Sequence, residues 1–239
     1  MIGGYVVRAA NVAIAPEIIM VGAPTFDKHW RSVCRVIEGP RSVVQSMVCT
    51  HYLGKWPGVV RCGLVMVAKG EPVGMCIYAE PPSQSNVRFG GQGFELARLW
   101  ISDTVPRNAE TWLIAQSVRF VKRKWPALKY LVSYADPSAG HRGTIYKAAN
   151  WIFDGRTDAG RKTPRCDYVD ERGKKYSRAS HIPAGLSVSR VPRVSKFRFV
   201  YWLSGAPKAK ESGATANQQA KVDMRKAARS TVGRDVGMP

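Results

Sequence analysis

The feature that most constrains the fold is a helix-patterned segment that lies between two strand-like segments. Residues 94–102 and 128–135 are largely apolar, as strands of a buried sheet are. Between them, residues 108–124 repeat Ala, Trp, Leu, Phe and Val on one helical face, and three basic residues crowd the last turn, where they suit the helix dipole. This alternation of strands and a helix predicts an α/β fold.

The rest of the chain extends the pattern in both directions. The strands predicted at 59–67 and 72–79 form a hairpin around the turn Lys69-Gly70-Glu71. Together the elements predict a mixed sheet flanked by helices. The other predicted elements are extended segments at 5–15 and 18–21, helices at 27–38, 43–52 and 144–150, a loop at 81–93, and strands at 151–154 and 197–203.

The charge of the chain points to a polyanionic partner. It carries 37 Lys and Arg against 17 Asp and Glu, a formal net charge of +20. Such an excess favours nucleic acid first and an anionic membrane surface second. No stretch is long and apolar enough to span a bilayer, and five scattered cysteines without a C-x-x-C spacing favour neither a zinc site nor a disulfide framework.

Composition also divides the chain. We expect one folded domain over residues 1–204, in which residues 155–195 form a basic insert or loop region. Residues 205–239 are rich in Ala, Gly, Ser, Gln and Lys, which predicts a basic, flexible tail.

Four stretches of sequence carry a resemblance to a known family. They read ELARLWI at 95–101, PRNAETW at 106–112, LVSYADP at 131–137 and GHRGTIYKAANW at 140–151, and the last two form a long and unusual block. HYLG at 51–54 and the terminal FRFVYWL are similar as well. On these residues the chain resembles the bacteriophage Mom family over residues 40–205.

The resemblance implies a GNAT-like mixed sheet, the class whose element order matches the predicted one, in which the fourth and fifth strands part to admit an acyl donor. It also implies a DNA-modifying transferase in the host cell cytoplasm that converts adenine in phage DNA to N6-carbamoylmethyladenine and so protects the DNA from host restriction. Two alternatives are a conventional GNAT N-acetyltransferase acting on a protein or RNA amine, and a non-catalytic basic nucleic-acid-binding protein.

The candidate catalytic residues lie where strands end, because ligands of open α/β sheets collect at the carboxyl ends of strands. Asp136 ends the strand predicted at 128–135, and we expect adenine N6 to be activated either by Asp136 as a base or by a relay through Tyr146. Arg98 lies within the adjacent strand, where an unpaired charge is costly, so we expect it to meet Asp136, Glu95 or a ligand. A turn-forming Asp-Pro pair and a purely structural Arg98–Asp136 ion pair are the alternatives.

Aromatic and imidazole side chains complete the predicted site. His51 and Tyr52 end a predicted helix and are assigned to catalysis, although a histidine at that position also suits the helix dipole. Tyr134, His141 and Trp56 are assigned to the substrate, because adenine must leave the duplex stack before its N6 can react and aromatic rings can hold it.

The donor site departs from the usual GNAT pattern. Residues 102–109 (SDTVPRNA) lack the glycines that let a backbone cradle the pyrophosphate of coenzyme A. Arg107 and Asn108 at the start of the helix, with Ser133, are the predicted donor-binding residues, and acetyl-CoA is a donor by fold analogy alone. Two histidines and an aspartate offer nitrogen and oxygen ligands without a recognisable metal spacing, so the metal ligands are unknown and iron is left open.

The implied product favours another donor. Acetyl transfer would attach a carbonyl carbon to N6, whereas carbamoylmethyl is joined through a methylene and carries one more nitrogen. A glycyl donor such as glycyl-tRNA supplies those atoms. The expected partners are therefore double-stranded DNA, with tRNA as a candidate donor carrier, a second copy of the chain as a candidate homodimer partner, and no membrane.

Overall fold

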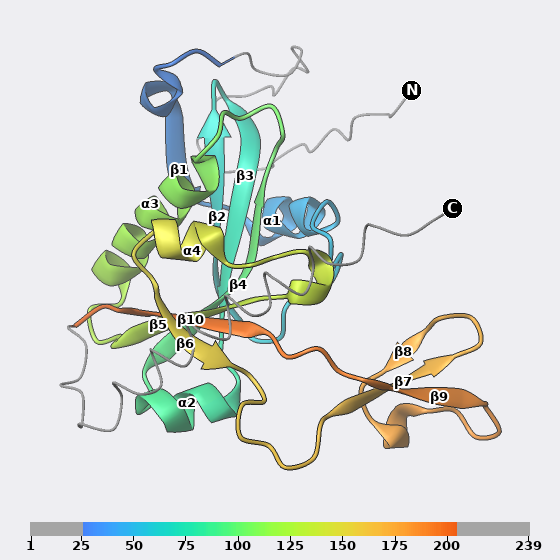
Figure 1. Ribbon diagram of the computed structural model, residues 1–239. Helices are drawn as coiled ribbons and strands as arrows, with labels where there is room; N and C mark the ends of the chain where they lie inside the picture. The colour runs from blue at the N-terminus through green and yellow to red at the C-terminus, as the bar shows by residue number, and fades with distance from the viewer. Residues whose placement is uncertain (1–25, 205–239) are drawn as a thin grey trace, which may run out of the picture.

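The computed structural model describes residues 26–204, which form a seven-stranded mixed sheet, with helices packed on both of its faces, and a separate three-stranded sheet (Figure 1). The predictions for residues 5–21 and for the tail 205–239 lie outside the described residues. In spatial order, the strands of the large sheet are β1 (Cys34–Glu38), β2 (Val60–Ala68), β3 (Glu71–Ala79), β4 (Gly93–Ile101), β5 (Tyr130–Ala135), β10 (Phe197–Trp202) and β6 (Ile152–Arg156). The helices are α1 (Arg41–Val48), α2 (Ser83–Phe89), α3 (Ala109–Lys124) and α4 (Thr144–Ala148), with 3-10 turns η1 (Trp30–Val33), η2 (Pro137–Ala139) and η3 (Ala179–His181).

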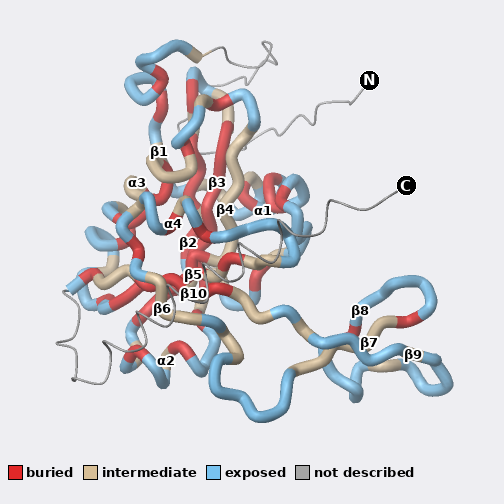
Figure 2. The backbone as a smooth tube through the Cα atoms, in the orientation of Figure 1, coloured by how far each residue is buried: buried red, intermediate tan, exposed pale blue. Residues whose placement is uncertain are grey.

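Each face of the large sheet has its own core, because successive side chains of a strand point to opposite faces. On one face, α3 buries Leu113 and Val121 in the same cluster as Leu64 of β2. On the other face, α1 buries Val44 together with Val65, the next residue of that strand. Figure 2 shows the buried residues concentrated along the central strands.

The sheet divides at its one parallel pair. Neighbouring strands are antiparallel except β4 and β5, whose register runs only from Gly93↔Tyr130 to Glu95↔Val132. Beyond Glu95, β4 continues to Ile101 while β5 continues to Ala135, and the two strands no longer pair. This gap between β4 and β5 is the opening that the resemblance implied.

Most predicted elements are confirmed, but the helix expected at 27–38 is wrong. Cys34–Glu38 is instead strand β1, which pairs antiparallel with β2 from Cys34↔Ala68 to Glu38↔Leu64. The apolar spacing fitted a helix, but β1 satisfies the backbone groups of β2 that would otherwise form an open sheet edge. Tertiary pairing therefore overrides the local pattern. The hairpin, the strands β4, β5, β6 and β10, and the helices α1, α3 and α4 lie where the sequence predicts them, within a few residues.

The loop expected at 81–93 is also wrong in part, because it contains helix α2. Pro82 lies directly before the first helical residue, and Gly90 ends the helix in a left-handed conformation with φ 78°. The buried ring of Phe89 packs 4.9 Å from the ring of Tyr130 and 5.7 Å from that of Trp202. These contacts with β5 and β10 hold the helix in place.

The basic insert region contains the small sheet. Its strands are β7 (Cys166–Asp170), β8 (Lys175–Tyr176) and β9 (Val188–Pro192), in the order β8-β7-β9. We call residues 157–196, which carry this sheet between β6 and β10, the arm. It extends away from the large sheet and most of its surface is exposed (Figures 1 and 2). In the described part of the chain, no helix is long and apolar enough to span a bilayer.

Candidate active site

A cavity of about 990 Å³ occupies the gap between β4 and β5. Residues from both faces of the sheet contribute to it, since Tyr134 and Ala135 are successive residues of β5 with opposite orientations. Its walls come from the segment after α1, from β4, from the loop before α4 and from the root of the arm. Lining side chains with polar or aromatic groups include His51, Tyr52, Glu95, Arg98, Glu110, Tyr134, His141, Arg142, Tyr146, Asp158, Arg165, Arg193, Lys196 and Arg198.

Three rings, each tilted against the next, contact one another in a row at the rim of the cavity. The ring centroids of His51 and Tyr52 are 4.5 Å apart, and those of Tyr52 and His141 are 5.0 Å apart. The Leu53 backbone N–H donates to Nδ1 of His51 at 3.1 Å, so the proton of the neutral ring is on Nε2. Burial, then the positive charge of Arg98 and the nearby His141, lowers the pKa of His51 to about 4. His51 is thus neutral near pH 7, while Tyr52 is 53% exposed and faces solvent.

A β-bulge in β4 lies directly before Arg98 and changes the direction of its side chain. Ile77 of β3 pairs with Arg98 and the next residue, Tyr78, pairs with Leu96, which leaves Ala97 as an extra residue. The guanidinium of Arg98 donates from Nε and Nη2 to the carbonyl of Lys55 at 3.0 and 2.9 Å, and from Nη1 to that of Ala97 at 2.7 Å. No carboxylate in residues 26–204 forms an ion pair with it, so the Arg98–Asp136 pair considered from the sequence is not formed.

Glu95 lines the cavity, whereas the sequence pattern suggests for it only a role as a partner of Arg98. It is the last residue of β4 that pairs with β5, and its side chain accepts no hydrogen bond from a described residue. Burial raises the pKa of Glu95 to about 7, against the opposing charges of Arg98 and Lys196. A carboxylate inside an apolar strand sequence, between Phe94 and Leu96, is the signal that could have identified it.

The hydroxyl of Tyr146 reaches the cavity from a buried ring. Its ring packs 5.5 Å from that of Trp151 and 5.3 Å from that of Phe199. The Ser133 hydroxyl lies 2.8 Å from the Tyr146 hydroxyl and 2.8 Å from the Leu96 carbonyl, so it bridges β5 and β4 just past their last pair. Burial raises the pKa of Tyr146 to about 12, which keeps its proton in place at neutral pH.

Asp136 lies behind the cavity lining rather than in it. Its Oδ1 accepts hydrogen bonds from the Ser138 backbone N–H at 3.0 Å and the Ser138 hydroxyl at 2.5 Å, and Lys196 Nζ lies 3.2 Å from its Oδ2. Burial alone would raise the pKa of Asp136, but the Ser138 and Lys196 interactions outweigh it and lower the pKa. Both oxygens are engaged, and a lowered pKa makes a weak base.

The structure separates the remaining predicted residues. Tyr134 and His141 line the cavity, and the Tyr134 hydroxyl lies 2.5 Å from Oγ of Ser85. Trp56 does not line it: its ring packs against the α1 core and lies under the Arg41 guanidinium, 5.4 Å from the ring centroid. Ser133 is buried beneath the lining.

The residues at the start of α3 do not fit the pyrophosphate of coenzyme A. Arg107 and Asn108 are exposed and outside the cavity lining, and Asn108 has φ 70° without a side-chain cap. The residue of this turn that does line the cavity is Glu110, whose carboxylate would repel a phosphate. Within residues 26–204, no group of three or more His, Cys, Asp or Glu side chains could hold a metal ion, so the iron left open from the sequence gains no support.

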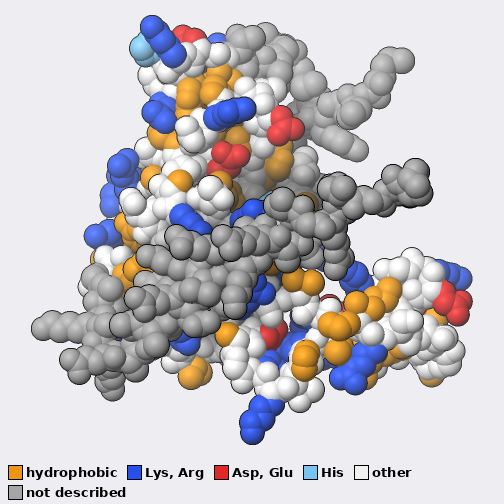
Figure 3. Space-filling model, in the orientation of Figure 1, with side chains coloured by type: hydrophobic (Ala, Val, Ile, Leu, Met, Phe, Trp, Pro, Cys, Tyr) orange, Lys and Arg blue, Asp and Glu red, His pale blue; other side chains and the backbone are white. Residues whose placement is uncertain are grey.

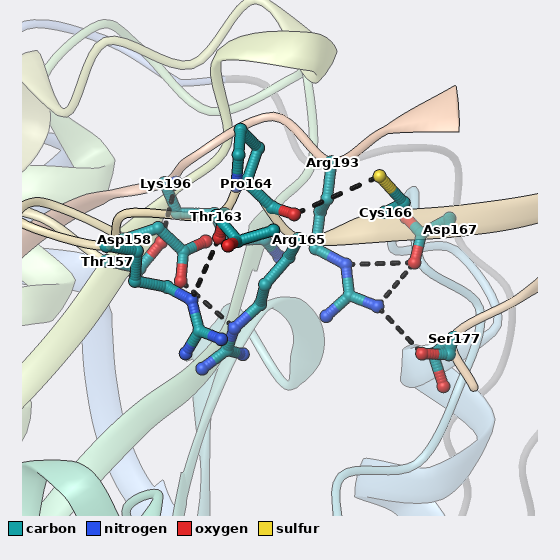
Figure 4. Close-up of polar contacts among 11 residues, drawn as sticks. Thr157, Asp158, Thr163, Pro164, Arg165, Cys166, Asp167, Ser177, Arg193 and Lys196 are labelled. Atoms are coloured by element: carbon teal, nitrogen blue, oxygen red, sulfur yellow. Dashed lines mark hydrogen bonds and ion pairs between the residues drawn. The ribbon is translucent and has the colours of Figure 1, made fainter. Parts of the chain in front are cut away.

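The root of the arm supplies three of the six Lys and Arg residues that line the cavity, namely Arg165, Arg193 and Lys196. Figure 4 shows the polar contacts of the root. Arg165 Nε lies 3.0 Å from Oδ1 of Asp158, and Arg193 forms an ion pair with Asp167 and donates to the Ser177 carbonyl at 3.2 Å. The two chains of the root are joined to each other. The Thr157 N–H donates to the Lys196 carbonyl at 2.9 Å, and the Lys196 N–H donates to Thr157 Oγ1 at 3.1 Å.

This architecture, a mixed sheet with parted β4 and β5 strands and a helix between them in sequence, defines a GNAT-like α/β protein. The chain is similar to the GNAT family acetyltransferase from Elizabethkingia anophelis, with 9% identity and a TM-score of 0.44 over 71% of this chain and 98% of that one. It is also similar to ribosomal-protein-S5-alanine acetyltransferase from Vibrio fischeri, with 9% identity and a TM-score of 0.45 over 78% of this chain and 100% of that one.

The sequence relationship is narrower. The chain belongs to the Mom protein family, whose model matches residues 35–221. It is 34% identical over 61 residues to methylcarbamoylase mom of Escherichia phage Mu, a match that spans 26% of this chain and 25% of that protein.

Proposed function

We propose that this chain is a phage transferase that modifies adenine in DNA to N6-carbamoylmethyladenine and thereby protects the DNA from restriction in the host cytoplasm. Membership of the Mom family and the likeness to a methylcarbamoylase support this class of activity. The observation that carries the proposal is the placement of Glu95, a carboxyl group with a pKa near 7, in a cavity rimmed by aromatic rings.

The cavity suits a base that has left the duplex stack. Its volume of about 990 Å³ exceeds what one adenine requires and leaves room for a donor group. Extrusion of a base costs roughly a few kcal/mol, and each stacking contact with an aromatic ring returns roughly 1–3 kcal/mol. The rim rings of Tyr52 and His141, with Tyr134 on the opposite strand, are the side chains positioned to provide that stacking.

Adenine N6 is a weak nucleophile, because its lone pair is delocalised into the ring, so it needs a base. Glu95 fits this role better than Asp136, because both oxygens of Asp136 are engaged and its pKa is lowered. A group whose pKa lies near the working pH can both accept a proton and return it. The neighbouring guanidinium of Arg98 lies where it can stabilise negative charge that develops during attack on a carbonyl.

A glycyl donor balances the atoms of the product. N6 attacks the carbonyl carbon of an activated glycine, the bond from that carbon to its carrier breaks, and the N6 proton passes through Glu95 to the departing carrier oxygen. The free glycyl amine then attacks C6 through a five-membered ring. The bond between C6 and the original N6 breaks, and that nitrogen leaves C6 as the terminal amide after regaining a proton. No oxidant or reductant is consumed.

The turn before α3 helps to choose between possible carriers of the glycine. Because that turn does not fit the pyrophosphate of coenzyme A, we favour an aminoacyl ester such as glycyl-tRNA. The same misfit counts against a conventional coenzyme A-dependent acetyltransferase. A non-catalytic DNA-binding protein would tolerate loss of the Glu95 carboxylate without consequence.

Mass spectrometry of nucleosides tests the proposal. DNA from cells that express the chain should contain modified adenine, and Glu95→Gln should remove it, whereas Glu71→Gln at the β2–β3 turn should not. Unmodified adenine in the wild-type sample would refute the function. Feeding nitrogen-labelled glycine tests the donor: the label should appear on the nitrogen bonded to C6, and its absence from the modified base, or its presence only in the terminal amide, would exclude the scheme.

A further inference from the structure

The arm contains more positively charged side chains than it has carboxylates to pair with them. Residues 157–196 contain ten Lys and Arg against four Asp and Glu. Of these forty residues, all within the described part of the chain, Asp170 and Tyr176 are the buried ones. A sheet of three short strands with so little buried surface has no hydrophobic core of its own. Polar contacts therefore define its shape.

The acidic residues of the arm are already committed near its root and in one turn. Asp158 pairs with Arg165, and Asp167 pairs with Arg193. Asp170 accepts hydrogen bonds from the Arg172 and Lys174 backbone N–H groups at 3.0 and 2.8 Å, and from the Tyr176 hydroxyl at 3.1 Å. These contacts fix the turn between β7 and β8. Asp158, Asp167 and Asp170, three of the four acidic residues of the arm, are therefore engaged within the arm.

The outer cations of the arm are left without such partners. The side chains of Arg172, Lys174, Lys175, Arg178 and Arg190 are exposed, and none forms an ion pair with a carboxylate in residues 26–204. Figure 3 shows Lys and Arg side chains (blue) standing out from the arm. Gathering exposed like charges on a small sheet is unfavourable unless a polyanion neutralises them.

The strand register places an aromatic ring beside one of these cations. Tyr168 of β7 lies opposite Tyr176 of β8 and opposite Arg190 of β9. Side chains that lie directly opposite in an antiparallel sheet emerge on the same face. The Lys174 ammonium lies 5.2 Å from the centroid of the Tyr176 ring. One face of the arm thus combines cations with aromatic and hydroxyl groups, a combination that binds sugar–phosphate backbone.

We propose that the arm is a backbone-binding surface for duplex DNA, and that it holds the substrate beside the cavity while the target adenine occupies the cavity. The partner rests on the proposed function, and the surface rests on the charge and register described above. The root of the arm lines the cavity through Asp158, Arg165, Arg193 and Lys196, so DNA on the arm and a base in the cavity would be neighbours.

The salt dependence of DNA binding tests the proposal. Full-length protein is titrated against a fluorescent duplex between about 0.05 and 0.2 M salt, without donor, so that no chemistry is needed. The triple variant Arg172→Ala, Lys174→Ala, Arg190→Ala removes up to three phosphate contacts. The slope of log affinity against log salt should become less steep by about 2–3, because each contact contributes about 0.9. Over this fourfold range, the salt-induced loss of affinity should shrink by up to about 40-fold.

Two comparison variants make the result specific. The triple Lys28→Ala, Arg31→Ala, Arg35→Ala removes the same charge at the β1 end of the sheet, far along the strand order from β6, and should leave the slope unchanged. The charge-conserving triple Arg172→Lys, Lys174→Arg, Arg190→Lys should retain the wild-type slope, which separates lost phosphate contacts from misfolding of the arm.

An unchanged slope in the alanine triple of the arm would overturn the proposal, as would an equal change in the β1-end triple. Failure of wild-type protein to bind duplex DNA would overturn it as well. If the arm variant loses affinity for tRNA and keeps its slope with DNA, the arm binds the donor carrier instead and the proposal is wrong. If the wild-type protein binds DNA through the arm but does not modify adenine, the proposed function is refuted and the binding surface stands.

Discussion

Replacing Glu95 by Gln is expected to stabilise the folded protein and to inactivate it. The pKa of this carboxyl group is raised from 4.5 to about 7, chiefly by burial. Since one pKa unit corresponds to about 1.4 kcal/mol, keeping Glu95 ionised in the cavity lowers the free energy of unfolding by about 3 kcal/mol above pH 7. Gln keeps the shape of the side chain and removes this charge.

The sign of the pH dependence follows from the raised folded-state pKa. Below pH 4.5 the carboxyl group is protonated in both the folded and the unfolded chain, so it makes no difference to stability there. Between pH 4.5 and about 7 the unfolded chain has released the proton while the folded chain still binds it, so the folded state becomes progressively less stable as the pH rises, and the loss is complete above about 7. The wild type and Glu95→Gln should therefore differ little at pH 5, and the variant should be more stable by up to about 3 kcal/mol at pH 8.

Urea unfolding at pH 5 and pH 8 measures the stability, and nucleoside mass spectrometry measures the activity of the same preparations. Loss of a general base typically lowers the rate by about 10²–10⁴-fold, and the rise in rate with pH up to about 7 should disappear. Glu71→Gln should change neither quantity. If wild type and Glu95→Gln differ in unfolding free energy by the same amount at pH 5 and at pH 8, the burial argument is refuted. If the variant modifies adenine at the wild-type rate, Glu95 is not the base.

Further outcomes follow from the surroundings of His51 and Gly143. Nuclear magnetic resonance should show His51 neutral at pH 6 and titrating at about 4, and a pKa at the ordinary 6.5 would contradict its burial beside Arg98. Gly143 has φ 73°, and a Cβ there would lie 2.1 Å from the Phe199 ring, so Gly143→Ala should lower the free energy of unfolding by about 2–5 kcal/mol. Gly140→Ala, with φ 75° and open space around its Cβ, should cost only about 1–2 kcal/mol; equal losses of stability in the two variants would contradict the steric account.

The sequence predicts those parts of the fold whose local pattern agrees with their tertiary surroundings. Helix α3 has both an apolar face and a basic last turn, and β5 is largely apolar because both of its faces are covered. The prediction from the sequence is wrong at β1, because the apolar spacing there fits a helix, whereas pairing with β2 makes the segment a strand. It fails again at α2, whose stability comes from Phe89 packing on distant rings of β5 and β10.

The sequence also locates the cavity, through His51, Tyr52, Arg98 and Tyr146, but it does not assign the chemistry within it. Asp136 was the natural choice of base because it ends a buried strand. Its engagement by Ser138 and Lys196 depends on a residue 60 positions away in the sequence and could not be read locally. The raised pKa of Glu95 likewise results from burial that only the folded chain creates.

The short ladder between β4 and β5 has a mechanical consequence. Since three register pairs connect the two strands, the large sheet consists of a four-stranded half, β1 to β4, and a three-stranded half, β5, β10 and β6, joined along a narrow seam. The ladders on either side of this seam are longer and antiparallel, with six pairs between β3 and β4 and six between β5 and β10. Relative motion of the halves would therefore widen or narrow the cavity directly, with the Ser133–Leu96 bridge as the first tie to break. Local opening of the sheet is expected to begin at this seam, and the amides of residues 94 to 96 should exchange with solvent faster than those of β2 and β3.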